Sequence, residues 1–267
     1  MPLVNNNDNA ASDQNRNRSP SKSWWKQKKW WLSAVVAVLI ALVGYVVVVP
    51  EWNHYTKAQA ADALAQQNLQ KDQPVNKGKT PANLNLSYQD DNHRITTGDD
   101  LKKAADSNGT LYLKGYFGAP SQKGLEKIPA MPINAGVSDR VLAYGAGEVK
   151  PDRAVGQGNY VIAFHNFPYG KALQHMNPNQ KPKVYISDKQ KVYEYELSSE
   201  KSVYKAGEAY SKAIQQTTEP RLTVYTCDEP YTVWIPRPDN RLVASGKLVA
   251  TYPVNDAPKA AKETFAA

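Results

Sequence analysis

An uninterrupted apolar run near the N-terminus constrains this chain more than any other feature of its sequence. Residues 32–49 read LSAVVAVLIALVGYVVVV, without a charged side chain or a proline. A helix of eighteen residues rises roughly 27 Å, close to the hydrocarbon thickness of a bilayer. Aromatic side chains, which favour membrane interfaces, flank the run on both sides: Trp24, Trp25, Trp30, Trp31, Trp52 and Tyr55. We therefore expect one transmembrane helix over residues 32–49.

The charge distribution predicts the orientation of this helix. Residues 1–31 carry six Lys or Arg side chains and two Asp, which is +4 of the total formal charge of +8. After the apolar run, the first basic residue other than histidine is Lys57. The positive-inside rule therefore places residues 1–31 in the cytoplasm and the remainder outside the cell membrane. Contact with anionic headgroups then accounts for the basic tail, and we expect no nucleic-acid partner.

The apolar run has two other interpretations. A cleaved signal peptide would use the small residues of Ala58-Gln59-Ala60, but these lie well past the end of the run. A buried core helix would leave the polar tail and the flanking tryptophans unexplained. An uncleaved single-pass anchor is the interpretation that fits best.

The rest of the chain divides by composition. A polar helix and a segment rich in Pro, Gly and Asn follow the apolar run, which indicates a stalk ahead of a folded domain. The expected organisation is a basic cytoplasmic tail at 1–31, an anchor at 32–49, a stalk or linker at 50–86, a catalytic domain at 87–257 and a C-terminal tail at 258–267.

The domain shows many short β-branched or aromatic runs and few helices. We expect helices at 99–106 and at 138–144, the second with Ser138 as its N-cap. Many short strands with few helices indicate a closed or nearly closed β-barrel, or a sandwich. The expected strands are 111–113, 130–133, 159–164, 183–187, 192–197, 222–227, 231–235 and 242–251.

Cys227 is the sole cysteine, so it forms no internal disulfide and is either a buried core residue or a reactive thiol. An external thiol is readily oxidised, which favours a function for it. His165 ends an apolar strand and Arg241 begins another. Taken alone, His165 would be interpreted as a structural residue and Arg241 as a solvent-exposed residue at the edge of a strand. Together, the thiol, imidazole and guanidinium suit attack on an acyl carbon, proton transfer and stabilisation of an oxyanion.

Four blocks of the sequence resemble the sortase family. Leu222-Thr-Val-Tyr-Thr-Cys227 is similar to the TLxTC signature, with Val224 in place of Leu. Residues 160–166 (YVIAFHN) resemble the histidine strand of the family, and residues 239–249 (DNRLVASGKLV) resemble its arginine strand. Residues 132–139 and 145–151 are similar to the class A housekeeping branch. The resemblance covers roughly residues 108–252, in the family's order of His, Cys and Arg.

The resemblance implies a mostly β fold, a closed eight-stranded sortase-type β-barrel with short helices, preceded by one N-terminal transmembrane helix. It also implies cysteine transpeptidation of surface proteins that carry a C-terminal Leu-Pro-x-Thr-Gly signal. Cys227 would form a thioacyl enzyme at the Thr carbonyl, and a peptidoglycan-precursor amine of the lipid II type would resolve it. His165 would transfer protons, and Arg241 would stabilise the oxyanion.

The substrate groove is expected to be apolar because it receives Leu and Pro. Thr226 is expected to add a hydrogen-bond donor beside the nucleophile, and Trp234 to flank the entry of the amine. Phe164 replaces the small residue that often precedes the family's histidine, and we expect it to pack in the barrel or against the adjacent loop. The other candidates for the groove are Ala143, Ile162, Val203, Val224 and Ile235.

No cofactor is expected, calcium included. Some class A members bind Ca²⁺ in the loop before the histidine strand. Here that loop offers Glu148 and Asp152 beside Lys150 and Arg153, which is a poor ligand set for calcium.

Two other functions stay open at this stage. A membrane-tethered cysteine hydrolase or peptidase would use the same three residues and pass the acyl group to water. A non-catalytic surface-binding module with a degenerate site would not need all three. A pilin-polymerising sortase would be expected to carry a lid and a C-terminal span, and residues 258–267 are too polar to provide that span.

Overall fold

A computed structural model describes residues 22–70, 73–84, 86–88, 95–228 and 239–266. Two compact units divide the chain at Pro50, a residue within the first helix. The helices are α1 Lys22–Gln70, α2 Gly98–Asp106, α3 Asp139–Tyr144, α4 Lys171–Gln174, α5 Glu208–Ala213 and α6 Lys259–Phe265. Short helical turns lie at η1 Asn166–Gly170, η2 Pro178–Gln180 and η3 Val254–Asp256.

The first unit contains the apolar part of α1. Its large side chains are exposed, including Ile40 at 67% and Val43 at 63%. Among the described residues, this is the one helix long and apolar enough to cross a membrane. The expected anchor over 32–49 therefore lies within a candidate membrane span.

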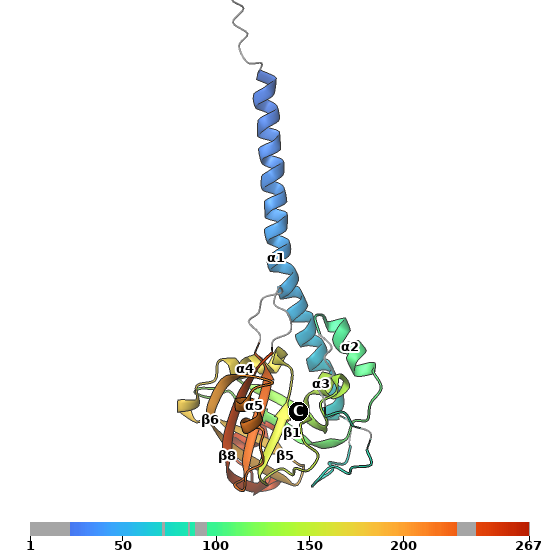
Figure 1. The fold of residues 1–267 in the computed structure, drawn as a ribbon, viewed down its shortest axis with the longest axis vertical. Helices are drawn as coiled ribbons and strands as arrows, with labels where there is room; N and C mark the ends of the chain where they lie inside the picture. Colours follow the sequence, from blue (N-terminus) through green and yellow to red (C-terminus); the bar gives the residue numbers. More distant parts are fainter. Residues whose placement is uncertain (1–21, 71–72, 85, 89–94, 229–238, 267) are drawn as a thin grey trace, which may run out of the picture. The chain divides into compact units, whose positions relative to one another are not determined.

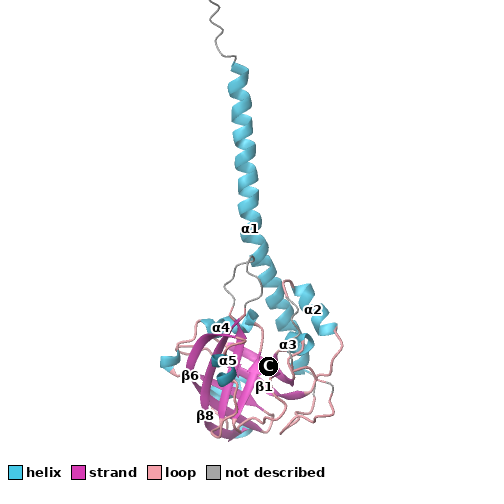
Figure 2. Cartoon of the chain, viewed as in Figure 1, coloured by secondary structure: helices cyan, strands magenta, loops and turns pink. Residues whose placement is uncertain are grey.

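The second unit is built on a closed β-barrel (Figures 1 and 2), as expected. The strands follow the order β1-β2-β3-β4-β7-β8-β6-β5 around the barrel. The β2–β3 and β4–β7 pairs are parallel, and the remaining pairs are antiparallel. The strands are β1 Leu113–Ala119, β2 Ile128–Ala135, β3 Ala146–Glu148, β4 Asn159–Ala163, β5 Lys183–Ser187, β6 Lys191–Tyr204, β7 Arg221–Cys227 and β8 Asn240–Pro253.

Alternation along the strands fills the barrel with apolar side chains. Fully buried residues such as Phe117, Tyr160 and Leu222 belong to a single core cluster. The expected cap of α3 is confirmed, because the Ser138 hydroxyl accepts a hydrogen bond from the backbone N–H of Val141 at 3.3 Å. This cap directs the chain from β2 through α3 into β3.

The segment expected to be a stalk differs from that expectation, because much of it packs on the barrel unit. In α1, Ala60 and Ala61 are buried in a cluster with Leu101 of α2 and Phe167 of η1. Further on, the Asn76 backbone N–H donates to the Leu113 carbonyl at 2.8 Å. Small side chains allow this close helix packing, and strand-edge carbonyls provide acceptors for the segment that follows.

The C-terminal segment also differs from the expected tail. Residues 259–265 form α6, whose Ala261 is fully buried in a cluster with Tyr185 and Val192. A Cβ atom added to Gly118 of β1 would lie 2.7 Å from the Thr264 side chain. Glycine therefore permits the close approach of this helix to the barrel.

Candidate active site

Three neighbouring strands bring Cys227, His165 and Arg241 to one end of the barrel. Cys227 is the last residue of β7 and is paired directly with Arg241 near the start of β8. In the parallel β4–β7 pair, Ala163 is opposite Tyr225. Continuing this register by two residues places His165 beside Cys227. The three predicted residues, 62 and 14 positions apart in the sequence, therefore become neighbours through strand pairing.

All three residues also lie on the outer face of the barrel. On each strand the intervening residues belong to the core, for example Phe164 on the histidine strand, Val224 on β7 and Leu242 on β8. Since neighbours along a strand point to opposite faces, the residues that alternate with these face outward. These outward residues are Val161, Ala163 and His165, then Thr223, Tyr225 and Cys227, and then Arg241, Val243 and Ser245.

Burial differs between the nucleophile and the cation. Cys227, at the strand end, is half-buried. Arg241 is only 2% exposed, and its Nη1 donates to the Asn240 carbonyl at 3.1 Å. A guanidinium removed from water interacts more strongly with a nearby negative charge than a solvated one does. The pair thus combines a half-buried cysteine with a desolvated positive charge.

The loop after the histidine is held by the C-terminal part of α1. The His165 ring stacks on Phe167, with 5.0 Å between ring centroids and 10° between planes. The Lys57 ammonium lies 4.4 Å from the centroid of the same Phe167 ring. The Tyr169 hydroxyl donates a hydrogen bond to the Asp62 carboxylate. These contacts fix the orientation of the imidazole from a segment far away in the sequence.

An apolar part of the barrel's outer face adjoins the three residues, and it is covered, since each of its members is at most 9% exposed. Its members come from β4, β6, β7, β8, α5 and the loops that carry Val137 and Val149, and Tyr210 meets Tyr225 edge to face with 5.5 Å between ring centroids. Sequence reasoning missed most of this surface, although the two-residue spacing from His165 and Cys227 identifies Ala163 and Tyr225. We call it the outer apolar surface: Val137, Val149, Val161, Ala163, Val203, Tyr210, Tyr225 and Val243.

The predicted groove residues are therefore corrected in part. Ile162 and Val224 are fully buried in the barrel core and face away from Cys227. Thr226 shares the inward alternation of Val224 and is 1% exposed. Ala143 belongs to the cluster beneath α1 and α2. Of the described candidates, Val203 alone lies on the outer face, opposite Arg241.

The other expectations have mixed outcomes. Phe164 packs in the barrel core, 4% exposed, with its ring centroid 5.7 Å from that of Phe117, as expected. Trp234 and Ile235 lie outside the described residues.

The carboxylates considered for calcium are engaged with protein groups. Glu148 is fully buried, with Oε1 3.7 Å from Lys114 Nζ and Oε2 accepting from the Thr80 hydroxyl at 2.8 Å. Desolvation raises the pKa of Glu148 to about 7, although the Lys114 charge opposes this rise. Across the described parts of the chain, no three His, Cys, Asp or Glu side chains gather as a metal site. The independence from calcium stays a prediction.

Comparisons with known proteins agree with the resemblance. Residues 126–249 match the family model described as Sortase domain. Sortase A of Listeria monocytogenes is 28% identical over 130 residues, which cover 46% of this chain and 55% of that protein. Sortase A of Streptococcus agalactiae is 32% identical over 111 residues, which cover 38% of this chain and 42% of that protein. The chain thus spans about half the length of these curated relatives.

Solved structures resemble the chain at lower identity. The structure of sortase A from Listeria monocytogenes is 23% identical with a TM-score of 0.46, and the match covers 57% of this chain and 96% of that one. Sortase C-3 of Streptococcus pneumoniae is 18% identical with a TM-score of 0.45, and the match covers 76% of this chain and 86% of that one. The sequence matches support the sortase family for residues 126–249, the segment that contains His165, Cys227 and Arg241.

Proposed function

We propose that this chain is a membrane-anchored cysteine transpeptidase of the class A sortase type. The observation that carries the proposal is the pairing of Cys227 with Arg241, with His165 on the same outer face. Its substrates would be surface proteins with a C-terminal Leu-Pro-x-Thr-Gly signal, cleaved between Thr and Gly. The acceptor would be an amine of a lipid II-type peptidoglycan precursor.

The first half-reaction forms a thioester. The Cys227 thiolate attacks the Thr carbonyl carbon, and the carbonyl electrons move onto oxygen. The Arg241 guanidinium stabilises that oxyanion, and its burial increases the effect. The oxyanion then collapses, the C–N bond to Gly breaks, and His165 as imidazolium gives its proton to the leaving amine.

The second half-reaction reverses these roles. An incoming amine attacks the thioester carbon while neutral His165 accepts a proton from the amine nitrogen. The C–S bond breaks, and Cys227 leaves as the thiolate. The positive charge of Arg241 favours that thiolate. Enzyme and histidine thus return to the thiolate–imidazolium pair in which they began.

The outer apolar surface supports a peptide substrate rich in Leu and Pro. Ala163, Tyr225 and Val243 each lie two residues from a member of the site and face the same way. A motif bound at Cys227 through its Thr residue would lay the preceding Leu and Pro on this surface after displacing the side chains that cover it, Tyr210 of α5 among them, because each member is at most 9% exposed. Residues 1–31 would lie in the cytoplasm and the barrel outside, following the positive-inside rule.

The test compares full-length protein in detergent micelles with Cys227→Ala. A fluorogenic Leu-Pro-x-Thr-Gly peptide is supplied with and without a glycine-type amine, and products are identified by mass. Cleavage that requires Cys227 and yields the amine-ligated product supports transpeptidation. Free acid as the sole product indicates the hydrolase, and no cleavage across varied motifs and amines indicates the binding module.

A further inference from the structure

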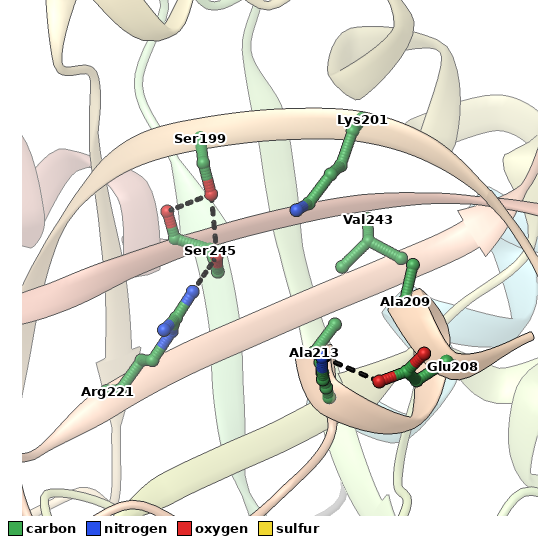
Figure 3. A pocket seen from close by; sticks show the side chains of 9 residues that line it. Ser199, Lys201, Glu208, Ala209, Ala213, Arg221, Val243 and Ser245 are labelled. Carbon is green, nitrogen blue, oxygen red and sulfur yellow. Dashed lines mark hydrogen bonds and ion pairs between the residues drawn. The ribbon is translucent and has the colours of Figure 1, made fainter.

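A second feature of the outer face is a polar pocket of about 400 Å³ beyond the apolar surface. Ser199 and Lys201 of β6 lie on one side, and Arg221 of β7 lies on the other (Figure 3). Val243 and Ser245 of β8 form the floor between them. The remaining lining residues belong to α5: Glu208, Ala209, Lys212 and Ala213.

Strand register connects this pocket to the candidate active site. Val243, on the pocket floor, is opposite Tyr225, which precedes Cys227 by two residues. At roughly 3.3 Å per residue, the pocket begins about 7 Å along the strand from Cys227 and ends at Arg221, about 20 Å away. A peptide bound at Cys227 through Thr and extended along this face would reach the pocket with the residues that precede its Leu.

The pocket carries an excess of positive charge. Lys201, Lys212 and Arg221 contribute three cations, and Glu208 contributes the one carboxylate among the lining residues. Lys212 Nζ lies 2.7 Å from Glu208 Oε1, so these two charges compensate each other. Lys201 forms no ion pair with any carboxylate in the described part of the chain, and Figure 3 shows its ammonium directed between Ser245 and Val243.

Hydrogen-bond donors converge on the same space. Arg221 Nη2 donates to the Ser245 hydroxyl, which lies 2.7 Å from the Ser199 hydroxyl. Within the described residues, the buried Arg221 Nε has no acceptor. A guanidinium and an ammonium beside two linked hydroxyls form a receptor for a carboxylate. A cationic ligand would be repelled by the same arrangement.

From this geometry we infer that the pocket binds an acidic side chain of the client protein one or two residues before its sorting motif, because Ser245, where the donors converge, is opposite Thr223, four residues from Cys227. The inference rests on the proposed function. It assigns Lys201 and Arg221 to substrate selection, because they contact a part of the client that takes no part in bond exchange. The expected consequence is a lower KM for clients with Asp or Glu at this position and an unchanged kcat.

The experiment uses the full chain in detergent micelles and two matched fluorogenic peptides. Both carry the same motif, and they differ only in Glu or Gln at the residue directly before Leu. A partly exposed charge-assisted contact predicts a KM for the Glu peptide about three- to tenfold lower at low salt, with the difference shrinking as salt screens it. Lys201→Gln should reduce the ratio of the two KM values to less than twofold. Its kinetics with the Gln peptide should equal those of the wild type.

The matched control is Lys123→Gln, which removes one exposed cation from the turn between β1 and β2, a segment outside the pocket. Lys123→Gln should preserve the full difference in KM between the Glu and Gln peptides. Equal KM values for both peptides, or an equal effect of Lys123→Gln, would overturn the inference and leave the proposed function intact. Cleavage of neither peptide would instead contradict the proposed function itself.

A further arm separates a carboxylate site from a phosphate site. Inorganic phosphate and pyrophosphate are added at matched ionic strength, with both peptides as substrates. If the pocket serves an acidic side chain, these anions reduce the advantage of the Glu peptide and leave the Gln peptide unaffected. Inhibition of both peptides to the same extent, abolished by Lys201→Gln, would indicate a phosphate-bearing ligand and overturn the assignment.

Discussion

The substitution Glu148→Gln should remove a pH-dependent loss of stability from the barrel unit. Glu148 is fully buried on β3, and burial raises its pKa from 4.5 to about 7. The folded protein therefore holds a proton on this carboxyl between pH 4.5 and 7 that the unfolded chain releases. Stability conferred by the neutral form is present below pH 4.5 and is lost as the pH rises through 7.

The pKa difference sets the size of the effect. At about 1.4 kcal/mol per pKa unit, ionisation of Glu148 lowers the free energy of unfolding by about 3 kcal/mol between pH 4 and pH 8. Glutamine has the shape of the protonated acid and does not titrate. The stability of Glu148→Gln relative to the wild type should therefore rise by about 3 kcal/mol over this range.

Urea unfolding of residues 50–267, the second compact unit, at pH 4, 6 and 8 measures this difference. Titrating groups that do not interact with Glu148 contribute equally to both proteins and cancel, whereas the neighbouring Lys114 loses the partner charge that raises its pKa. Glu263→Gln on α6 is the matched control, because its side chain is 63% exposed, and its offset should stay within about 0.5 kcal/mol at all three pH values. The reasoning would be refuted if the unfolding free energy of Glu148→Gln relative to the wild type stayed constant with pH, or fell as the pH rises.

Four more outcomes follow from the site and the core. Arg241→Gln should lower kcat about 10²- to 10³-fold with a small change in KM, as measured by peptide cleavage, because it removes the charge that faces the oxyanion. Phe167→Leu should lower kcat about tenfold by releasing the stacked His165 ring, whereas unchanged kinetics would exclude this positioning role. Phe164→Ala should cost about 3–5 kcal/mol of unfolding free energy in urea, since it empties part of the core. Added Ca²⁺ or EDTA should alter activity less than twofold, and a several-fold rise with Ca²⁺ would contradict the prediction.

The sequence predicted the strands with strong local patterns and missed those without one. β5 has the expected bounds, Lys183–Ser187, because β-branched and aromatic residues fill it between turn residues. β3 was missed, because Ala146–Glu148 is three residues long and contains glycine. The pairing of β3 with β2 and β4 depends on distant parts of the chain, which a local pattern does not report.

The predictions for the substrate groove chose residues of the wrong strand face, for a different reason. Ile162 precedes His165 by three positions, and Val224 precedes Cys227 by three. An odd separation along a strand places two residues on opposite faces, so alternation alone excludes both from a surface shared with the site. The same rule selects Ala163 and Tyr225, which the structure places on the outer apolar surface. Apolar character was a weaker guide here than strand parity.

The compact unit that contains the barrel begins at Pro50, and this affects how activity is to be tested. The polar helix and the Pro, Gly and Asn that follow it predict a stalk, whereas the inward side of the helix, made mostly of alanine, packs on the barrel unit: Ala60, Ala61, Leu64 and Ala65. Alanine gives little hydrophobic signal, yet its small size allows close packing against α2 and the loop after His165. A chain that starts near residue 84 would lose the Lys57–Phe167 contact and the hydrogen bond between Asp62 and Tyr169. If such a shortened chain were inactive, the cause would be a misplaced His165. The transpeptidase assay therefore requires residues 50–70.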